Sequence, residues 1–280
     1  MQSQQVITVA FQGVAGAYSE EAAASLGPSV QAEGLPSFAE VFAAVQSGRC
    51  AAGVVPIENS LAGTVYQVID LLYSSDLYVV GEAMVRVRHQ LLARPGTRLE
   101  QVQEVLSHPQ ALDQCAGYLR RMGLRAVPAY DTAGAALQLL EREDQRVACI
   151  ASRRAADLYG LDILAEDIED EDFNTTRFLV LSRDRTPLTG GSDYKTSLVF
   201  AVRHQPGSLV AALKAFGDHG VNMSKLESRP RRDRNWSYLF FADLESGLSD
   251  PALQAALSEL MHSASFVKVL GSYPSAKESA

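Results

Sequence analysis

The residues with the clearest potential for chemistry are two hydroxyls beside a guanidinium in the segment NTTRF. Thr175 and Thr176 directly precede Arg177. A threonine hydroxyl can donate a hydrogen bond to a departing oxygen, and a guanidinium can hold a carboxylate through two parallel hydrogen bonds. Side chains on a strand alternate between faces, so Thr176 and Arg177 point opposite ways unless the backbone is irregular there. The segment predicts a site for a small carboxylated ligand, in competition with an ordinary β-branched strand that carries a surface arginine.

Further candidate residues lie where predicted strands lead into predicted helices. They are Gly13, Gly16 and Ser19 at the first junction, Asn59 and Ser60 at the second, Ser107 and His108 at the third, Asp131 and Thr132 at the fourth, and Ser152 at the fifth. Glycine lets the backbone approach a ligand, and serine, threonine, asparagine and aspartate commonly cap helices. The carboxyl ends of parallel strands meet at one sheet edge, so these residues are expected to share a cleft. Helix N-termini there attract anions, although ordinary capping also explains each junction taken alone.

Other kinds of site find less support in the sequence. The spacing of Gly13 and Gly16 differs from the G-x-G-x-x-G dinucleotide fingerprint. The cysteines lack metal-type spacing and are expected to be buried, reduced thiols: Cys50, Cys115 and Cys149. Apart from His108, the histidines are interpreted as surface or core residues: His89, His204, His219 and His262.

Composition narrows the class of protein. With 280 residues, a hydrophobic fraction of 47% and a charged fraction of 21%, the chain has the usage of a folded globular protein. The net charge of −8 argues against a general nucleic-acid binder, which needs clustered lysine and arginine. The sequence has no apolar run long enough to span a membrane, and the N-terminus enters a strand pattern without a basic leader. We therefore expect a cytoplasmic protein.

The predicted elements that position these residues alternate between strands and helices. The strand-like runs are 6–11, 51–55, 77–93, 102–107, 125–130, 147–152 and 177–182, and the clearest helical patterns are 37–48, 109–123 and 132–144. A further helix is expected to start near Leu61. The alternation predicts an α/β fold with largely parallel sheets. The long extended stretch 77–93 breaks the alternation and predicts a crossing between two lobes.

A second unit follows a segment rich in Pro, Gly, Ser, Thr and Asp. The predicted order is strand 196–202, helix 207–220, strand 223–228, strand 236–245, helix 250–263 and strand 266–273. This βαββαβ order is that of a ferredoxin-like unit. Such a unit leaves one sheet face or edge open, which is commonly covered by a second copy.

Five segments of the first unit resemble the prephenate dehydratases of phenylalanine biosynthesis. QGVAGAYSE, PIENSLAGTV, LSHPQALDQC, DTAGAA and NTTRF occur in the family's order across residues 12–178. In the second unit, PGSL and ESRP resemble the family's regulatory ACT domain. The resemblance covers nearly the whole chain, with one departure at Ser208, where the family usually carries alanine. The first unit is also similar to plant arogenate dehydratases.

The resemblance implies a particular organisation of the chain. Residues 1–183 would form an α/β, two-lobed, periplasmic-binding-protein-like catalytic domain with a cleft between the lobes. Residues 184–194 would be a linker, and residues 195–275 a βαββαβ ferredoxin-like ACT domain.

The resemblance also implies a reaction in which prephenate loses carbon dioxide and water to give phenylpyruvate. Electrons from the ring carboxylate move through the diene and expel the opposite hydroxyl, so neither cofactor nor metal is expected. Thr176 of the TRF motif would donate a hydrogen bond to the departing oxygen, and Arg177 would hold the side-chain carboxylate. The remaining catalytic candidates are Asn59, Ser60, Ser107 and Thr132, and the substrate-binding candidates are Gly13, Gly16, Ser19 and Thr175. Glu58 would act as an acid only if it were buried.

The ACT resemblance implies L-phenylalanine as an effector, bound between the PGSL loop of one chain and the ESRP segment of another. Gly207, Ser208 and Leu209 would bind its carboxylate. The candidates for its ammonium group are Asn222, Glu227 and Ser228. The expected assembly is a homodimer or homotetramer.

Two alternatives remain open from the sequence. An arogenate dehydratase would differ in recognising an amino group where prephenate has a ketone. An amino-acid-sensing solute-binding protein would also use a two-lobed cleft lined by helix ends, but the NTTRF segment argues against a purely binding role.

Overall fold

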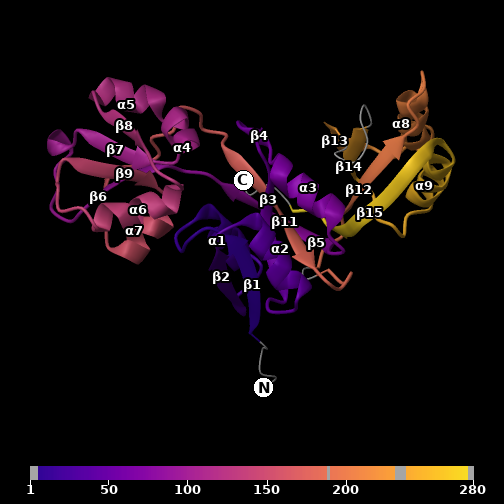
Figure 1. The fold of residues 1–280 in the computed structure, drawn as a ribbon, viewed down its shortest axis with the longest axis horizontal. Coiled ribbons are helices and arrows are strands. Elements are labelled where there is room, and N and C mark those ends of the chain that lie inside the picture. The colour runs from indigo at the N-terminus through magenta and orange to yellow at the C-terminus, as the bar shows by residue number, and fades with distance from the viewer. Residues whose placement is uncertain (1–5, 188–189, 231–237, 277–280) are drawn as a thin grey trace.

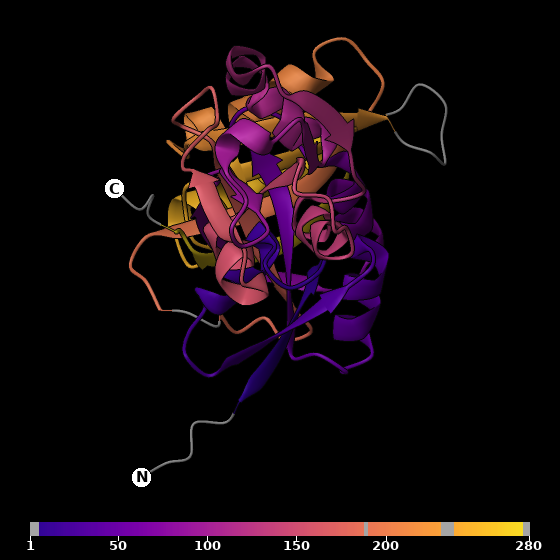
Figure 2. The same cartoon turned by 90° about the vertical axis from the view of Figure 1, so that its left-hand side faces the viewer.

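The computed structural model describes residues 6–187, 190–230 and 238–276. Two lobes and a C-terminal unit lie in a row, with the first lobe in the middle (Figure 1). Figure 2 looks along this row, with the second lobe in front of the other two bodies. Among the described residues, no helix is long and apolar enough to cross a membrane.

The first lobe is built on a mixed sheet. Its strands are β1 (Ile7–Gln12), β2 (Val30–Leu35), β3 (Ala52–Asn59), β4 (Gly63–Thr64), β5 (Tyr78–Arg86) and β11 (Thr175–Ser182). They lie in the order β2-β1-β3-β11-β5, with β4 paired to β3. The helices are α1 (Tyr18–Ala24), α2 (Phe38–Gln46) and α3 (Tyr66–Ser74). The inner strands read as nearly continuous apolar runs because both faces of the sheet are buried.

The second lobe has a sheet of its own. Its strands are β6 (Gln90–Ala93), β7 (Glu104–Ser107), β8 (Arg125–Pro128), β9 (Val147–Ala151) and β10 (Asp162–Ala165). They lie in the order β10-β6-β9-β7-β8. The helices are α4 (Pro109–Gln114), α5 (Ala116–Met122), α6 (Thr132–Leu140) and α7 (Arg153–Tyr159), with a 3-10 turn at Leu99–Gln101.

Two crossings join the lobes and lie side by side. The chain leaves the first lobe after β5 and returns at Asn174, just before β11. The amide of Val87 in the first crossing donates to the carbonyl of Asn174 in the second over 2.8 Å. The expected lobe crossing within 77–93 is confirmed, since β5 and β6 belong to different sheets.

Three details differ from the sequence-based prediction. The sheets are mixed rather than largely parallel, because β11 returns from the second lobe and inserts antiparallel to both β3 and β5. The helix expected near Leu61 begins at Tyr66, because β4 first folds back on β3. Strands β2 and β10 escaped the prediction, since both are sheet edges whose residues are mainly half-exposed.

The C-terminal unit confirms the βαββαβ prediction. It contains β12 (Tyr194–Val202), α8 (Ser208–Asp218), β13 (Met223–Pro230), β14 (Tyr238–Leu244), α9 (Pro251–Ser263) and β15 (Ala264–Pro274). The strand order β13-β14-β12-β15 is antiparallel throughout. Helices α8 and α9 cover one sheet face around Leu198, Phe200 and Leu260. The first two residues of the strand expected at 236–245 lie outside the described residues.

The other face of this sheet packs on the first lobe. Val199, Phe241 and Tyr273 share one buried core with Leu72 and Val79 of that lobe. A Cβ atom on Gly271 would lie 1.9 Å from the carbonyl oxygen of Val79, so glycine permits the close approach of β15 to β5. This sheet face, which was expected to need a second copy, is therefore covered within the chain.

Candidate active site

A cleft of about 610 Å³ lies between the two lobes. Residues of both lobes line it: Gln12, Ser37, Asn59, Thr64, Thr176 and Phe178 from the first, with His108, Gln110, Tyr130 and Asp131 from the second. A smaller pocket of about 140 Å³ adjoins it and shares Asn59 and Thr176. The smaller pocket also reaches Tyr18, His89 and Thr132.

Thr176 and Asn59 stand directly opposite each other on β11 and β3. Paired residues of an antiparallel ladder share a sheet face, and here that face is the cleft. Nδ2 of Asn59 donates to Oγ1 of Thr176 over 3.0 Å. Oδ1 of Asn59 accepts the amides of Leu61 and Ala62 at 3.0 and 2.9 Å, which fixes the orientation of its side-chain amide. Because Thr176 accepts this bond through its oxygen, its hydroxyl proton is available to a ligand.

A chain of side-chain amides, of which Asn59 and Asn174 are buried, continues from this pair across the lobe junction. Asn59 donates to Asn174 over 2.7 Å, and Asn174 donates to Gln114 over 3.1 Å. Oε1 of Gln114 lies 2.9 Å from Nε2 of His89, whose Nδ1 lies 3.2 Å from the Tyr18 hydroxyl. Burial lowers the pKa of His89, against the opposing effect of its hydrogen bond with Gln114, and so favours neutral imidazole. This series of hydrogen bonds thus holds Asn59 in place, and all of its side chains are neutral when His89 is a neutral imidazole.

Helix ends also face the cleft from the second lobe. His108 is the N-cap of α4, accepting the amide of Gln110 over 3.2 Å, and Asp131 is the N-cap of α6, accepting the amide of Gly134. The expected gathering of junction residues therefore holds for Asn59 of the second junction, His108 of the third and both residues of the fourth. Thr132, the first residue of α6, lines the smaller pocket as predicted.

Ser60 and Ser107 are used structurally. The Ser107 hydroxyl is fully buried and donates to the carbonyl of Ile150 over 2.8 Å. The Ser60 hydroxyl donates to the carbonyl of Phe173 over 2.9 Å and accepts the amide of Thr175 over 3.0 Å. These bonds join neighbouring chain segments, and neither side chain lines the cleft.

The first junction and Thr175 also lie outside the cleft lining. Helix α1 begins at Tyr18 after Ala17, so Ser19 is inside the helix and is not its cap. The carbonyl of Gly16 accepts the Ser152 hydroxyl over 2.6 Å, and a Cβ atom on Gly16 would lie 3.0 Å from Ala155. Gly16 therefore serves close contact between the lobes. Gly13 has a φ of 118°, which favours glycine at this turn.

The position of Arg177 corrects the prediction that it lines the cleft. It follows Thr176 on a regular stretch of β11 and so points to the opposite sheet face, where it is only 6% exposed. Its guanidinium contacts Glu58, Glu82 and Asp243. Burial opposes the charged form of Arg177, but Asp243, Tyr273 and Glu58 together outweigh it and raise the pKa. The guanidinium is thus held among carboxylates away from the cleft, although its Nε lies near Glu58 without making a hydrogen bond to any described residue.

Glu58 shares this face. Burial opposes its ionisation, but the charges of Arg177 and Lys225 outweigh that effect and lower its pKa. It is therefore ionised and does not line the cleft, which argues against a role as the catalytic acid.

Sequence reasoning missed Tyr18, His89 and Gln114, which line the smaller pocket. The spacing of Gln110 and Gln114 is the available signal, because residues four apart lie on one face of a helix. For His89 and Tyr18 there was no such signal, since their contact depends on how the two lobes meet.

The three cysteines are buried and unpaired, as predicted. Burial raises the pKa of Cys115 and Cys149, so these thiols stay protonated and unreactive.

The effector candidates lie on different parts of the C-terminal unit. Gly207 is the N-cap of α8 with a φ of 80°, and Ser208 is the first residue of that helix. Leu209 lines a pocket of about 180 Å³ with His204, Tyr238 and Phe240.

The other three candidates do not line that pocket. Asn222 precedes β13, and Glu227 and Ser228 lie on β13, where Ser228 pairs with Phe240 of β14. Asn222 donates to Glu245 over 2.6 Å. Glu227 accepts the hydroxyls of Thr64 and Tyr66 at 2.8 and 3.2 Å. The carboxylate expected to receive an ammonium group is thus in contact with the first lobe within this chain.

Comparison with known proteins agrees with this arrangement of domains. The prephenate dehydratase family model matches residues 9–186, and the ACT domain model matches residues 196–260. An Arabidopsis thaliana protein named arogenate dehydratase/prephenate dehydratase 2, chloroplastic, is 43% identical over 279 residues, which span 96% of this chain and 73% of the relative.

Two solved structures are similar over nearly the whole chain. One is described as GqqA, a novel type of quorum quenching acylase, with 38% identity, a TM-score of 0.89, and coverage of 96% of this chain and 98% of that one. The other is prephenate dehydratase from Arthrobacter aurescens in complex with L-Phe, with 30% identity, a TM-score of 0.88, and coverage of 96% and 90%. On the family match over most of the first unit, together with these relatives, this chain belongs to the prephenate dehydratase family and carries a C-terminal ACT domain.

Proposed function

We propose that the cleft binds prephenate and releases phenylpyruvate, carbon dioxide and water. The catalytic unit is residues 1–183, followed by a linker at 184–194 and a regulatory ACT unit at 195–275. The observation that carries this assignment is the Asn59–Thr176 pair, which leaves a fixed hydroxyl donor facing a cleft between two lobes.

The reaction needs little from the protein besides positioning and one hydrogen bond. The bond between the ring and its carboxylate breaks, and the electron pair moves through the diene to expel the hydroxyl on the opposite ring carbon. The hydroxyl takes up one proton as it leaves, and the ring becomes aromatic. Thr176 donates to the departing oxygen, or relays a proton to it, because a threonine hydroxyl is too weak an acid to be the ultimate proton source.

Neutral donors suit the two substrate carboxylates. With Arg177 engaged elsewhere, the donors available in the cleft include Gln110, Thr132 and Gln12. A strong cation on the ring carboxylate would stabilise the ground-state charge that decarboxylation removes, so neutral donors bind the substrate without that penalty.

The ACT unit supports a regulatory role for L-phenylalanine. The relative from Arthrobacter aurescens is a complex with L-Phe. The proposed effector site combines Gly207–Leu209 of one chain with Glu227–Ser228 of another, because Glu227 and Ser228 do not line the pocket that Leu209 lines in this chain. We infer a homodimer or homotetramer on that ground. The unpaired thiols fit the cytoplasm, although the Arabidopsis relative is chloroplastic.

Arogenate is the second candidate substrate, and one side chain favours it. Asp131 lines the cleft, and its carboxylate can pair with the ammonium group that replaces the ketone of prephenate.

The deciding experiment measures turnover of prephenate and arogenate by the wild type and Thr176→Ala, each with and without phenylalanine. Prephenate turnover that collapses in the variant and falls with phenylalanine supports both parts of the proposal. Preference for arogenate moves the assignment to the second candidate. Phenylalanine binding without turnover of either substrate would identify a sensor and overturn the enzyme assignment.

A further inference from the structure

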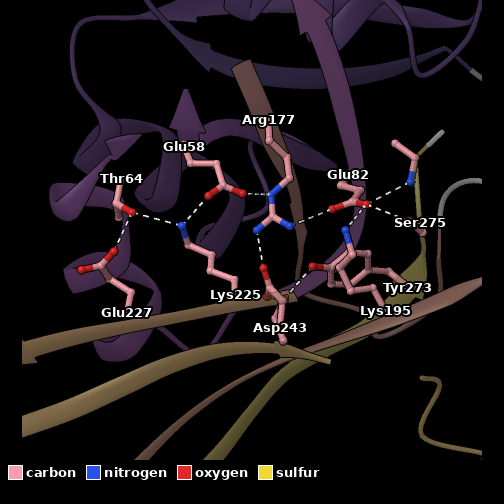
Figure 3. Close-up of polar contacts among 12 residues, drawn as sticks. Glu58, Thr64, Glu82, Arg177, Lys195, Lys225, Glu227, Asp243, Tyr273 and Ser275 are labelled. Atoms are coloured by element: carbon pink, nitrogen blue, oxygen red, sulfur yellow. Dashed lines mark hydrogen bonds and ion pairs between the residues drawn. The ribbon is translucent and has the colours of Figure 1, made fainter. Parts of the chain in front are cut away.

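A cluster of charged side chains lies between strands β3, β5 and β11 of the first lobe and the ACT sheet (Figure 3). Arg177 lies at its centre, with Glu58, Glu82 and Asp243 around the guanidinium. Lys225 contacts Glu58, and Lys195 lies 2.8 Å from Glu82. Three cations thus face three carboxylates, so the cluster is balanced in charge.

The cluster is connected to the catalytic pair through the backbone, because a cluster residue directly adjoins a catalytic residue in each of two dipeptides. Thr176 and Arg177 are neighbours on β11, and Asn59 and Glu58 are neighbours on β3. The register pairs Thr176 with Asn59 and Arg177 with Glu58. One side of this two-residue ladder therefore faces the cleft, and the other faces the ACT domain. The Arg177–Glu58 contact, 2.8 Å from Nε to Oε1, lies directly behind the Asn59–Thr176 bond.

The ACT sheet supplies anchors for both dipeptides. Asp243 on β14 is fully buried, contacts Arg177 and accepts the hydroxyl of Ser197, which lies 2.6 Å from the Tyr273 hydroxyl. Lys225 on β13 is paired with Glu58 and donates to Thr64 over 3.1 Å.

Stability alone is a weak reason for such a cluster. Removing charges from water is costly, and well-packed apolar residues often give equal or greater stability than a buried ion pair. What ions provide here is orientation, because a planar guanidinium fixes the directions of its partners. We propose that Asp243, and secondarily Lys225, are positioning residues of the ACT domain that act through Arg177 and Glu58 to hold Thr176 and Asn59 in their working geometry. This inference rests on the proposed function for its kinetic readout.

The test uses Asp243→Asn and the milder Lys225→Gln, with Lys268→Met as the matched control. Lys268 also joins the ACT sheet to the first lobe, donating to the carbonyls of Leu72 and Tyr73 at the end of α3, but it reaches neither dipeptide. All three variants lose an interdomain contact. We expect Asp243→Asn to lower kcat about 10- to 100-fold, as for a displaced catalytic group, with KM nearly unchanged. Lys268→Met should lower stability but leave kcat within about twofold.

A double variant separates positioning from general damage. In a Thr176→Ala background, Asp243→Asn should lower kcat by less than about twofold, because the hydroxyl that it positions is already gone. A multiplicative loss, or equal kcat in Asp243→Asn and Lys268→Met, overturns the inference while leaving the proposed function intact.

Hydrogen–deuterium exchange provides a readout that needs no turnover. Exchange in the β11 peptide, Thr175–Ser182, should rise in Asp243→Asn and to a smaller extent in Lys225→Gln, but stay at the wild-type level in Lys268→Met. Unchanged exchange in both cluster variants also overturns the inference, even if the wild type proves inactive on prephenate.

Discussion

The side-chain amide of Asn59 donates to the hydroxyl oxygen of Thr176 over 3.0 Å, directly across two paired strands. This direction of donation matters for the chemistry. An oxygen that accepts from Asn59 keeps its own proton for a third partner, and the open side of Thr176 is the cleft.

Replacing Thr176 tests the donor itself. Thr176→Val keeps the shape and removes the hydroxyl, so kcat should fall by about 10² to 10⁴ with little change in KM. Thr176→Ser keeps the hydroxyl and should retain most of the activity. Steady-state assays of phenylpyruvate formation give both numbers, and a Val variant within about tenfold of wild type would remove Thr176 from the mechanism.

Asn59→Asp reverses the hydrogen bond. A carboxylate only accepts, so the Thr176 proton would turn toward residue 59 and away from the substrate. We expect kcat to fall by about 10² to 10³ near neutral pH. A protonated carboxyl can donate again, so part of the loss should be recovered as the pH is lowered. A variant whose kcat is low at every pH would show that Asn59 has another role.

Gly271→Ala tests the contact between the ACT sheet and the first lobe. Its Cβ atom would fall 1.9 Å from the Val79 carbonyl oxygen, so the sheet must shift, which costs about 1–3 kcal/mol or more. The midpoint of urea unfolding should drop accordingly. Gly217→Ala in α8 is the control, because no described residue outside its own helix turn lies within 4 Å of its Cβ position and the helix should gain up to about 1 kcal/mol. Equal midpoints for the two variants would contradict the packing argument.

His89 gives a prediction for pH. Because its pKa is lowered in the folded state, the unfolded chain binds a proton first as the pH falls below about 6.5. Above that pH, His89 leaves the free energy of unfolding unchanged. Below it, the free energy of unfolding falls by up to about 1.4 kcal/mol per pH unit, until the pKa of the folded state is reached. Urea unfolding from about pH 7.5 to about pH 5.5 measures this slope. The slope should be smaller in His89→Gln, and equal slopes would exclude His89 as its source.

The sequence was informative where function depends on local pattern. The βαββαβ unit followed from periodicity, and Thr176, Asn59 and Thr132 were found from their places at strand and helix ends. It was uninformative where the contact joins distant segments. The NTTRF segment alone suggests that Arg177 binds a ligand. Its three acidic partners come from β3, β5 and β14, and no local pattern reveals that they meet. The contacts of His89 with Gln114 and Tyr18 also join distant segments, so the sequence alone indicates only a surface or core histidine.

Asn59 and Thr176 belong to the same sheet, and this affects how the enzyme can move. The two crossings at Val87 and Asn174 lie side by side, so a rotation of the lobes about them would carry the catalytic pair as one body. Opening would withdraw His108, Gln110 and Asp131 from the substrate and Gln114 from Asn174, while Asn59 would still donate to Thr176 within the first lobe. Lobe motion would then govern the entry of substrate and the escape of product, while the bond between Asn59 and Thr176 stays within a single sheet.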